Sequence, residues 1–171
     1  PPVAGGELME LRDAAGLEFA TWSGWATAIK SKPGGAPQFH QLAAGDWWTA
    51  LIDRAARTAT DTQADVALRT QALALLPHGG WQTTHGHVAD LVTARQPQEL
   101  QLAAIRLIGQ FAEPAAGAWL IEHYRVFSPA GRSAAVDLLA ARPAWQPLLI
   151  EAVEQRRIAA ADVPPVRRTL L

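Results

Sequence analysis

Three stretches of the 171-residue chain share one pattern of small and large apolar residues: Gln71-Ala72-Leu73-Ala74-Leu75-Leu76, Ala103-Ala104-Ile105-Arg106-Leu107-Ile108 and Ala134-Ala135-Val136-Asp137-Leu138-Leu139. The equivalent alanines Ala72, Ala104 and Ala135 lie 32 and 31 residues apart, and a shorter fourth copy begins at Arg167. An interval of this length is typical of proteins built from repeated helical hairpins. Alanine at a helix crossing lets two backbones approach, and the following large residues fill the space between layers.

From Asp46 onward, apolar residues recur at the i, i+3, i+4 and i+7 spacing of amphipathic helices, and no alternating strand pattern competes. The expected helices span residues 46–59, 63–76, 82–94, 98–111, 115–126, 129–141, 144–156 and 162–171. Among possible helix caps, Asp46, Asp61, Ser128 and Asp162 stand at helix starts. Each of the repeated stretches follows another apolar helix, so the repeating unit is a helix–turn–helix.

Such a hairpin cannot bury both of its apolar sides alone, and stacked neighbours complete its core. The pattern therefore predicts an all-α fold, a right-handed superhelix of about four hairpins. We place the hairpins at residues 46–78, 81–111, 114–142 and 143–171. Residues 1–45 are less regular and are expected to form an N-terminal helical segment or a degenerate repeat, with helices near 6–15 and 18–30 and an exposed loop at 31–37.

The composition and net charge of the chain exclude several classes of function. Hydrophobic residues make up 49% of the chain and charged residues 18%, which is enough apolar surface for a core. The net charge of −1 provides no global field that would gather nucleic acid or anionic lipid. The absence of cysteine removes disulfides, thiolate catalysis and covalent haem attachment. The chain opens without Met or a signal-peptide core and ends within an apolar run, so we expect it to be part of a longer protein.

The stretch from Pro97 to Trp119 resembles the junction between the second helix of one HEAT repeat and the next repeat. The residues that carry this resemblance are Ala103 to Gly109, Phe111 and Glu113-Pro114-Ala115. More narrowly, Arg69 to Leu171 is similar to the HEAT region of large exported bacterial proteins that combine a sugar-dehydrogenase-like β-propeller, HEAT repeats and a c-type cytochrome domain. That similarity depends on Leu73-Ala74-Leu75-Leu76, Gln101 to Arg106, Ser128-Pro129, Arg142-Pro143-Ala144-Trp145, Leu148-Leu149, Ile158 and Asp162.

The resemblance implies a HEAT or armadillo-like solenoid in a periplasmic or otherwise exported redox protein, where it would serve as a spacer or docking platform. Neither partner domain is present, because there is no Cys-x-x-Cys-His motif and no strand repeat. No haem-binding or dehydrogenase residue is therefore carried over to this chain. A cytoplasmic location stays open.

Arginines in equivalent repeat positions are the first candidate site. Arg69 and Arg132 stand three residues before the aligned alanines, and Gln101 takes this place in the middle copy. In a HEAT array the second helices line the concave face, so a strip that binds an acidic peptide or a phosphate chain would contain Arg69, Gln101, Arg106, Arg132, Arg167 and Arg168. The alternative is inter-repeat salt bridges to acidic neighbours such as Asp65, Glu99 and Asp137.

Seven tryptophans suggest a second candidate, a surface that stacks on sugar rings or bases. Core packing is the competing explanation, especially for Trp119 and Trp145 near the starts of first helices. Trp47 and Trp48 are adjacent and face different ways, so we expect at least one of them to be exposed or to lie at an interface.

His85 and His87 form a His-x-His pair, which is a weak candidate for metal binding. Side chains at i and i+2 of a helix point about 200° apart, so the two imidazoles diverge unless this segment is a loop. No metal, cofactor or catalytic motif is expected: the chain lacks a Gly-x-Ser-x-Gly elbow, a phosphate-binding glycine loop and a His-Glu-x-x-His motif.

These observations favour a non-catalytic interaction or scaffolding module that contacts neighbouring domains of a parent chain or another protein, without nucleic acid and without a membrane span. The alternatives are a HEAT-like enzyme that excises alkylated bases from DNA and a structural spacer without ligand. Continuous positive charge around an Asp and a Trp would favour the DNA enzyme, whereas a mixed or apolar surface would favour the protein platform. The oligomeric state stays open.

Overall fold

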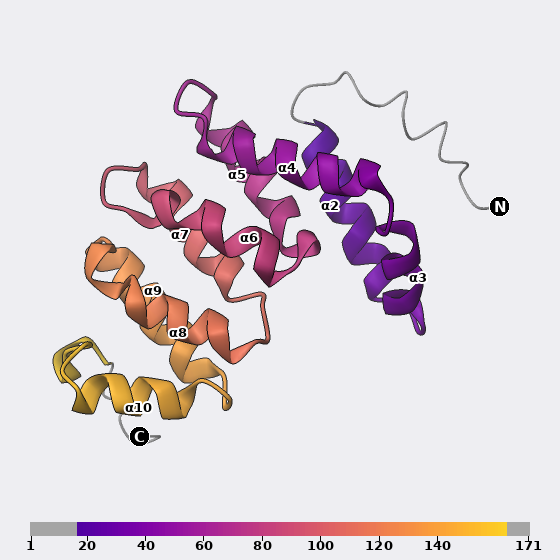
Figure 1. Cartoon of the computed structure of the whole chain (residues 1–171). Helices are drawn as coiled ribbons and strands as arrows, with labels where there is room; N and C mark the ends of the chain where they lie inside the picture. Colours follow the sequence, from indigo (N-terminus) through magenta and orange to yellow (C-terminus); the bar gives the residue numbers. More distant parts are fainter. Residues whose placement is uncertain (1–16, 164–171) are drawn as a thin grey trace. The chain divides into compact units, whose positions relative to one another are not determined.

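A computed structural model describes residues 17–163 of the chain, and in that range every regular element is a helix (Figure 1). The α-helices are α2 (Leu17–Lys30), α3 (Gly35–Leu42), α4 (Asp46–Thr60), α5 (Val66–Leu75), α6 (Trp81–Val88), α7 (Gln98–Ile108), α8 (Pro114–Glu122), α9 (Pro129–Ala141) and α10 (Gln146–Glu154). Short 3₁₀ helices are η2 (Leu76–Gly79), η3 (Ala89–Val92), η4 (Tyr124–Val126) and η5 (Ala160–Asp162). The expected all-α class is confirmed for the described range. The expected helix 6–15 and residues 164–171 lie outside this range.

Most helix positions follow the apolar periodicity, and the expected helix 129–141 coincides with α9. Two expected helices are shorter and tighten into 3₁₀ turns: 82–94 becomes α6 and η3, and 115–126 becomes α8 and η4. Ser128 caps α9 as predicted, because its hydroxyl oxygen accepts from the Gly131 amide at 3.2 Å. The other expected caps differ: Gly45 precedes α4, and Asp65, not Asp61, caps α5 by accepting from Ala67 at 2.7 Å.

The chain divides into two compact units, Pro1–Gly79 and Gly80–Leu171. In the first, α4 packs against α5 and α2 packs against both α5 and α3. The face of α4 toward this core is built from alanines, since Ala55, Ala56 and Ala59 are fully buried, as is Ala72 on α5. Small side chains allow α4 and α5 to lie close together, and larger residues such as Leu73 fill the remaining space.

The expected loop at 31–37 is wrong beyond residue 34, because α3 begins at Gly35. Gly34 adopts a left-handed conformation with φ of 73°, which turns the chain after α2. A β-carbon at Gly35 would overlap the carbonyl oxygen of Ile29, so only glycine permits this close approach to the end of α2. Pro37 lies in the first turn of α3, where no amide donor is required. The Gly and Pro residues that suggested a loop instead start a helix.

In the second unit, equivalent helices of successive hairpins contact one another: α7 packs against α9, and α8 packs against α10. Glycine and alanine residues again determine how closely the helices approach each other. Gly131 of α9 lies against Ile105 of α7, Gly109 at the end of α7 lies against Leu138, and the aligned Ala104 and Ala135 are fully buried. The side chains that follow them complete one apolar layer between α7 and α9.

Arg142 and Trp145 tie the α9–α10 junction to the preceding hairpin. The Arg142 guanidinium donates to the carbonyl oxygens of Gly109 and Phe111 after α7, and it lies 4.5 Å from the centre of the Trp145 ring. The Trp145 ring is fully buried against Gly117 of α8, and its Nε1–H donates to the Glu113 carbonyl oxygen at 3.2 Å. This confirms the expectation that Trp145 packs at a junction between helical layers.

None of the helices within residues 17–163 combines the length and the apolar character needed to cross a lipid bilayer.

We expect Gly117→Ala to lower the free energy of unfolding by about 1–2 kcal/mol, because the new methyl group would meet the rigid indole of Trp145 at 2.9–3.1 Å. Gly86→Ala in α6 is the matched control: nothing lies within 4 Å of its added methyl, so it should gain about 0.5–1 kcal/mol from helix propensity. Urea unfolding followed by circular dichroism measures both changes. Stabilisation of similar size by the two substitutions would contradict the described packing of α8.

Candidate functional site

The three aligned positions of the expected arginine strip bind backbone carbonyl groups of their own hairpins instead. Arg69 is only 3% exposed, and its Nε donates to the Ala59 carbonyl oxygen at 2.9 Å near the end of α4. Gln101 is also 3% exposed, and its Nε2 donates to the Gln96 carbonyl oxygen at 2.8 Å. Neither side chain therefore presents its polar group on an accessible surface.

The remaining members of the expected strip differ in accessibility. Arg132 is half-buried, and its Nη2 donates to the Arg125 carbonyl oxygen at 3.3 Å, so it too reaches back to the end of the preceding segment. Arg106 is exposed on α7. Arg167 and Arg168 lie outside the described residues. The three aligned positions thus share one role, which is to pair with carbonyl groups that the turn between two helices leaves without partners.

A tryptophan cluster, consisting of Trp22, Trp25, Trp47, Trp48 and Phe39, lies where α2, α3 and α4 of the first unit meet. Ring centres are 5.4 Å apart for Trp22 and Trp47, 5.4 Å for Trp47 and Trp48, and 5.3 Å for Phe39 and Trp48. Trp48 and Phe39 are buried, whereas Trp47 is 40% exposed. The expectation that one of the adjacent tryptophans is exposed is confirmed, and its ring is fixed by aromatic neighbours.

Two basic groups border the Phe39 ring. The Lys30 Nζ lies 4.2 Å above the ring centre, and partial burial lowers the pKa of Lys30. The centre of the His78 imidazole lies 6.0 Å from the centre of the Phe39 ring. Burial, assisted by the Lys30 charge, lowers the pKa of His78 to about 4, so its imidazole is neutral at pH 7.

The histidine pair of α6 does not converge. His85 Nδ1 lies 3.0 Å from the Trp81 carbonyl oxygen, which can only accept, and its ring stacks on Trp81 with centres 5.0 Å apart. His87 is exposed. His123 repeats the arrangement on Trp119, with the same 3.0 Å bond and ring centres 4.0 Å apart. Within the described range, no three His, Asp or Glu side chains come together as a metal site would require.

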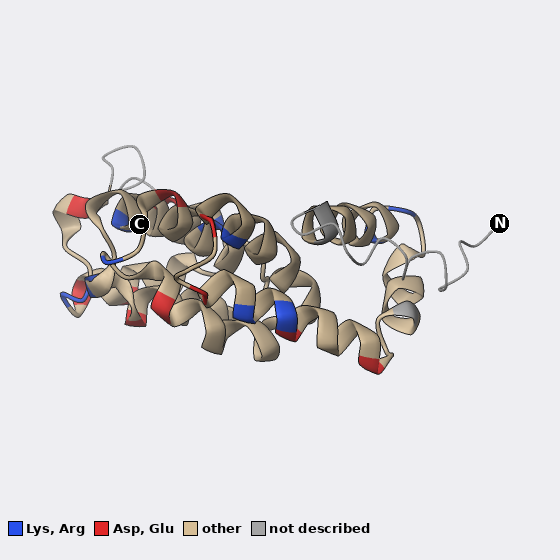
Figure 2. Ribbon diagram, turned by 90° about the horizontal axis from the view of Figure 1, so that it is seen from above, with Lys and Arg blue, Asp and Glu red and all other residues tan. Residues whose placement is uncertain are grey.

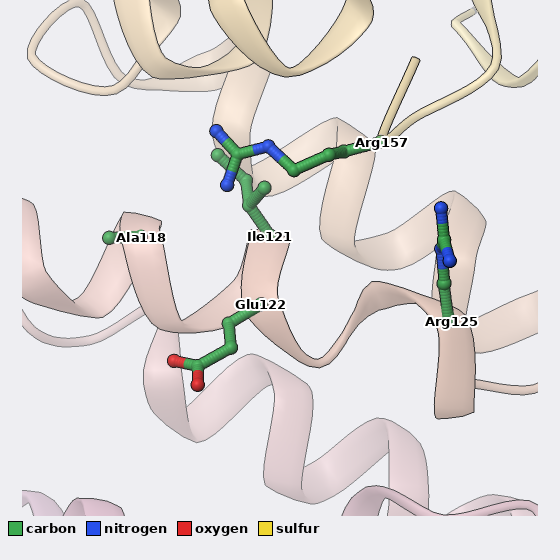
Figure 3. A pocket seen from close by; sticks show the side chains of 5 residues that line it. All are labelled: Ala118, Ile121, Glu122, Arg125 and Arg157. Atoms are coloured by element: carbon green, nitrogen blue, oxygen red, sulfur yellow. The ribbon is translucent and has the colours of Figure 1, made fainter. Parts of the chain in front are cut away.

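A pocket of about 560 Å³ in the second unit was not predicted from the sequence. Its lining comes from α8, η4 and the segment after α10, and consists of Ala118, Ile121, Glu122, Arg125 and Arg157. In Figure 3 the Arg157 guanidinium lies over Ile121, Arg125 stands on the opposite side, and the Glu122 carboxylate points away from both arginines. We call this the arginine pocket.

Both arginines of the pocket are positioned by the backbone around them. Arg125 lies in η4, where its carbonyl oxygen accepts from Arg132 and the adjacent Tyr124 hydroxyl donates to Asp162 at 2.9 Å. Burial and the Asp162 carboxylate raise the pKa of Tyr124, so this donor keeps its proton. Arg132 therefore binds the backbone at Arg125 without lining the pocket.

Arg157 follows a strained residue. Arg156 has φ of 57°, the left-handed conformation that glycine usually takes after a helix, and it is the one non-glycine residue between 17 and 163 with a positive φ. The amide of Arg156 donates to Val153 at 3.0 Å and that of Arg157 to Ala152 at 2.8 Å, which are the two bonds of a Schellman motif. This turn ends α10 and brings the chain to Arg157, which lines the pocket.

The lining of the arginine pocket consists of two guanidinium groups, one carboxylate and two aliphatic side chains. Two guanidinium groups beside an aliphatic wall suit an anionic group attached to an apolar body. Sequence reasoning missed the pocket because Arg125 and Arg157 fall outside the repeated stretches. The available signal was Arg156 standing after α10 where a glycine is typical.

Comparison of the chain with protein-family models, with curated proteins and with solved structures finds no match.

We expect Arg156→Gly to raise the free energy of unfolding by about 1 kcal/mol, because glycine adopts the left-handed conformation without steric cost. Gln155→Gly is the matched control: Gln155 has φ of −76°, so glycine there adds chain entropy to the unfolded state and should lower stability. Thermal unfolding of the two variants measures the difference, and destabilisation by Arg156→Gly would refute the strain assigned to this turn.

Proposed function

We propose that the chain is a HEAT-like right-handed solenoid that acts as a non-catalytic protein-interaction or scaffolding module. The contacts of α7 with α9 and of α8 with α10 support this architecture, because equivalent helices of neighbouring hairpins stack in this way in repeat proteins. The resemblance of Arg69 to Leu171 to the HEAT region of exported propeller and cytochrome proteins supports a role within a larger redox protein of the periplasm or cell exterior.

The observation that carries the interaction role is the exposure of Trp47. Among the side chains whose exposure the structure describes, the exposed large apolar ones are Trp47 and Val126, which is 46% exposed. Tryptophan and arginine are enriched among residues that dominate protein–protein binding energy. Because the buried rings of the tryptophan cluster hold the Trp47 indole in place, little conformational entropy would be lost when a partner covers it. A spacer without a ligand has no need for such a group.

The charge distribution favours a protein partner over DNA. Figure 2 shows Lys and Arg interspersed with Asp and Glu along the helices of residues 17–163. The burial of Arg69 and Gln101 removes two positions from the strip that a DNA-binding surface would have used. A base-excising enzyme would need continuous positive charge around an Asp and a Trp, and the alternation of acidic and basic residues along the described helices argues against it.

Site-specific photo-crosslinking in the cells that produce the protein tests this function. With p-benzoylphenylalanine at position 47, we expect discrete covalent adducts to one or a few proteins, because the probe would sit within the contact surface. Position 49 is the matched control, since Thr49 is exposed on the same helix two residues away and faces another direction. Absence of protein adducts above this control, or adducts to nucleic acid, would contradict the proposal.

A further inference from the structure

The arginine pocket presents two cationic groups that are available to a ligand. Arg125 and Arg157 are exposed, and within residues 17–163 neither guanidinium has a hydrogen-bond or salt-bridge partner. Glu122, the third charged group of the lining, points away from them (Figure 3). The pocket volume of about 560 Å³ falls within the range of roughly 300–1,000 Å³ that is typical of ligand sites.

The backbone at both arginines is held in place. The Arg132 bond to the Arg125 carbonyl fixes η4, and the left-handed Arg156 fixes the direction in which the chain leaves α10 at Arg157. Side chains that project from a fixed backbone lose less entropy on binding than side chains of a mobile loop. The apolar part of the pocket, Ala118 and Ile121, lies on α8 between these two points.

We infer that the arginine pocket binds a protein partner through one Asp or Glu carboxylate that is flanked by aliphatic side chains. This inference names the partner chemistry at a second site and rests on the proposed interaction function. A planar guanidinium donates two parallel hydrogen bonds to a carboxylate, and the exposed Ala118 offers apolar contact to the neighbouring side chain above Ile121, which is largely buried. Val126, exposed directly after Arg125, extends the apolar surface of η4.

The charge of the lining favours a carboxylate over a phosphate. Arg125, Arg157 and Glu122 together carry one net positive charge, which a single carboxylate neutralises. A phosphate carries about −1.5 to −2 at pH 7, which exceeds the one net positive charge of the lining. Exposed charges attract less strongly at high salt, and binding should therefore weaken as ionic strength rises.

The test uses the full chain labelled with ¹⁵N and a defined peptide, acetyl-Ala-Leu-Glu-Leu-Ala-amide. Titration followed by NMR of the arginine Nε–Hε groups should show saturable shifts of Arg125 and Arg157, with a Kd in roughly the millimolar range or tighter. The analogue with Gln in place of Glu should bind about tenfold more weakly or not at all, because it lacks the charge. A phosphoserine analogue should bind no more tightly than the Glu peptide.

Two arginine variants distinguish binding in the arginine pocket from nonspecific attraction to a positively charged surface. Arg157→Ala should weaken binding of the Glu peptide about tenfold or more, whereas Arg95→Ala removes an exposed arginine elsewhere in the same unit and should leave it unchanged. Circular dichroism spectra that match the wild type establish that both variants fold. Equal binding of the Glu and Gln peptides, tighter binding of phosphoserine, or equal loss in both variants would overturn the inference.

The peptide titration and the crosslinking experiment distinguish an error in the carboxylate site from an error in the proposed function. If the peptide does not bind but position 47 still forms protein adducts, the carboxylate site is wrong and the interaction module stands. If position 47 forms no adducts, the interaction function itself is contradicted.

Discussion

Close approach of helices through alanine and glycine is the constraint on which this structure depends. Ala104 and Ala135 are fully buried on α7 and α9, and Gly131 and Gly117 lie directly against Ile105 and Trp145. Each small residue lets a large one from the next element enter the space above it, so the layers interlock. The aligned alanine of the first unit, Ala72, is buried in the same way on α5. The repeat in the sequence is thus a repeat of small residues at helix crossings.

A second regularity concerns polar side chains in register with these alanines. Arg69, Gln101 and Arg132 each donate to a backbone carbonyl of the segment before their own helix, and Arg142 does the same for the carbonyls after α7. Carbonyl groups at helix ends lack intrahelical partners, and burying them without a hydrogen bond is costly. Positions that the sequence pattern predicts to form a binding strip therefore stabilise the turns of the hairpins. The exposed Trp47 and Arg157 side chains lie outside the three aligned stretches.

The helices were predictable because apolar periodicity is a local property of the sequence, and α9 begins and ends where the pattern predicts. Gly34, Gly35 and Pro37 misled the prediction, because glycine and proline suit both a loop and the start of a helix that packs closely on its neighbour. The exposed tryptophan was predictable from the adjacency of Trp47 and Trp48. The arginine pocket was not, since Arg125 and Arg157 are 32 residues apart and come to line one pocket only through the packing of α8 against α10.

The most direct test of the alanine crossings compares two positions in α7. Ala104 is fully buried and Ala103 is half-buried beside it, so replacing each with Leu changes helix propensity little while adding the same volume. Measured by urea unfolding, Ala104→Leu should lower the free energy of unfolding by about 1–3 kcal/mol, and Ala103→Leu should change it by less than about 0.5 kcal/mol. Equal tolerance of the two substitutions would show that close helix packing at Ala104 is not what holds these hairpins together.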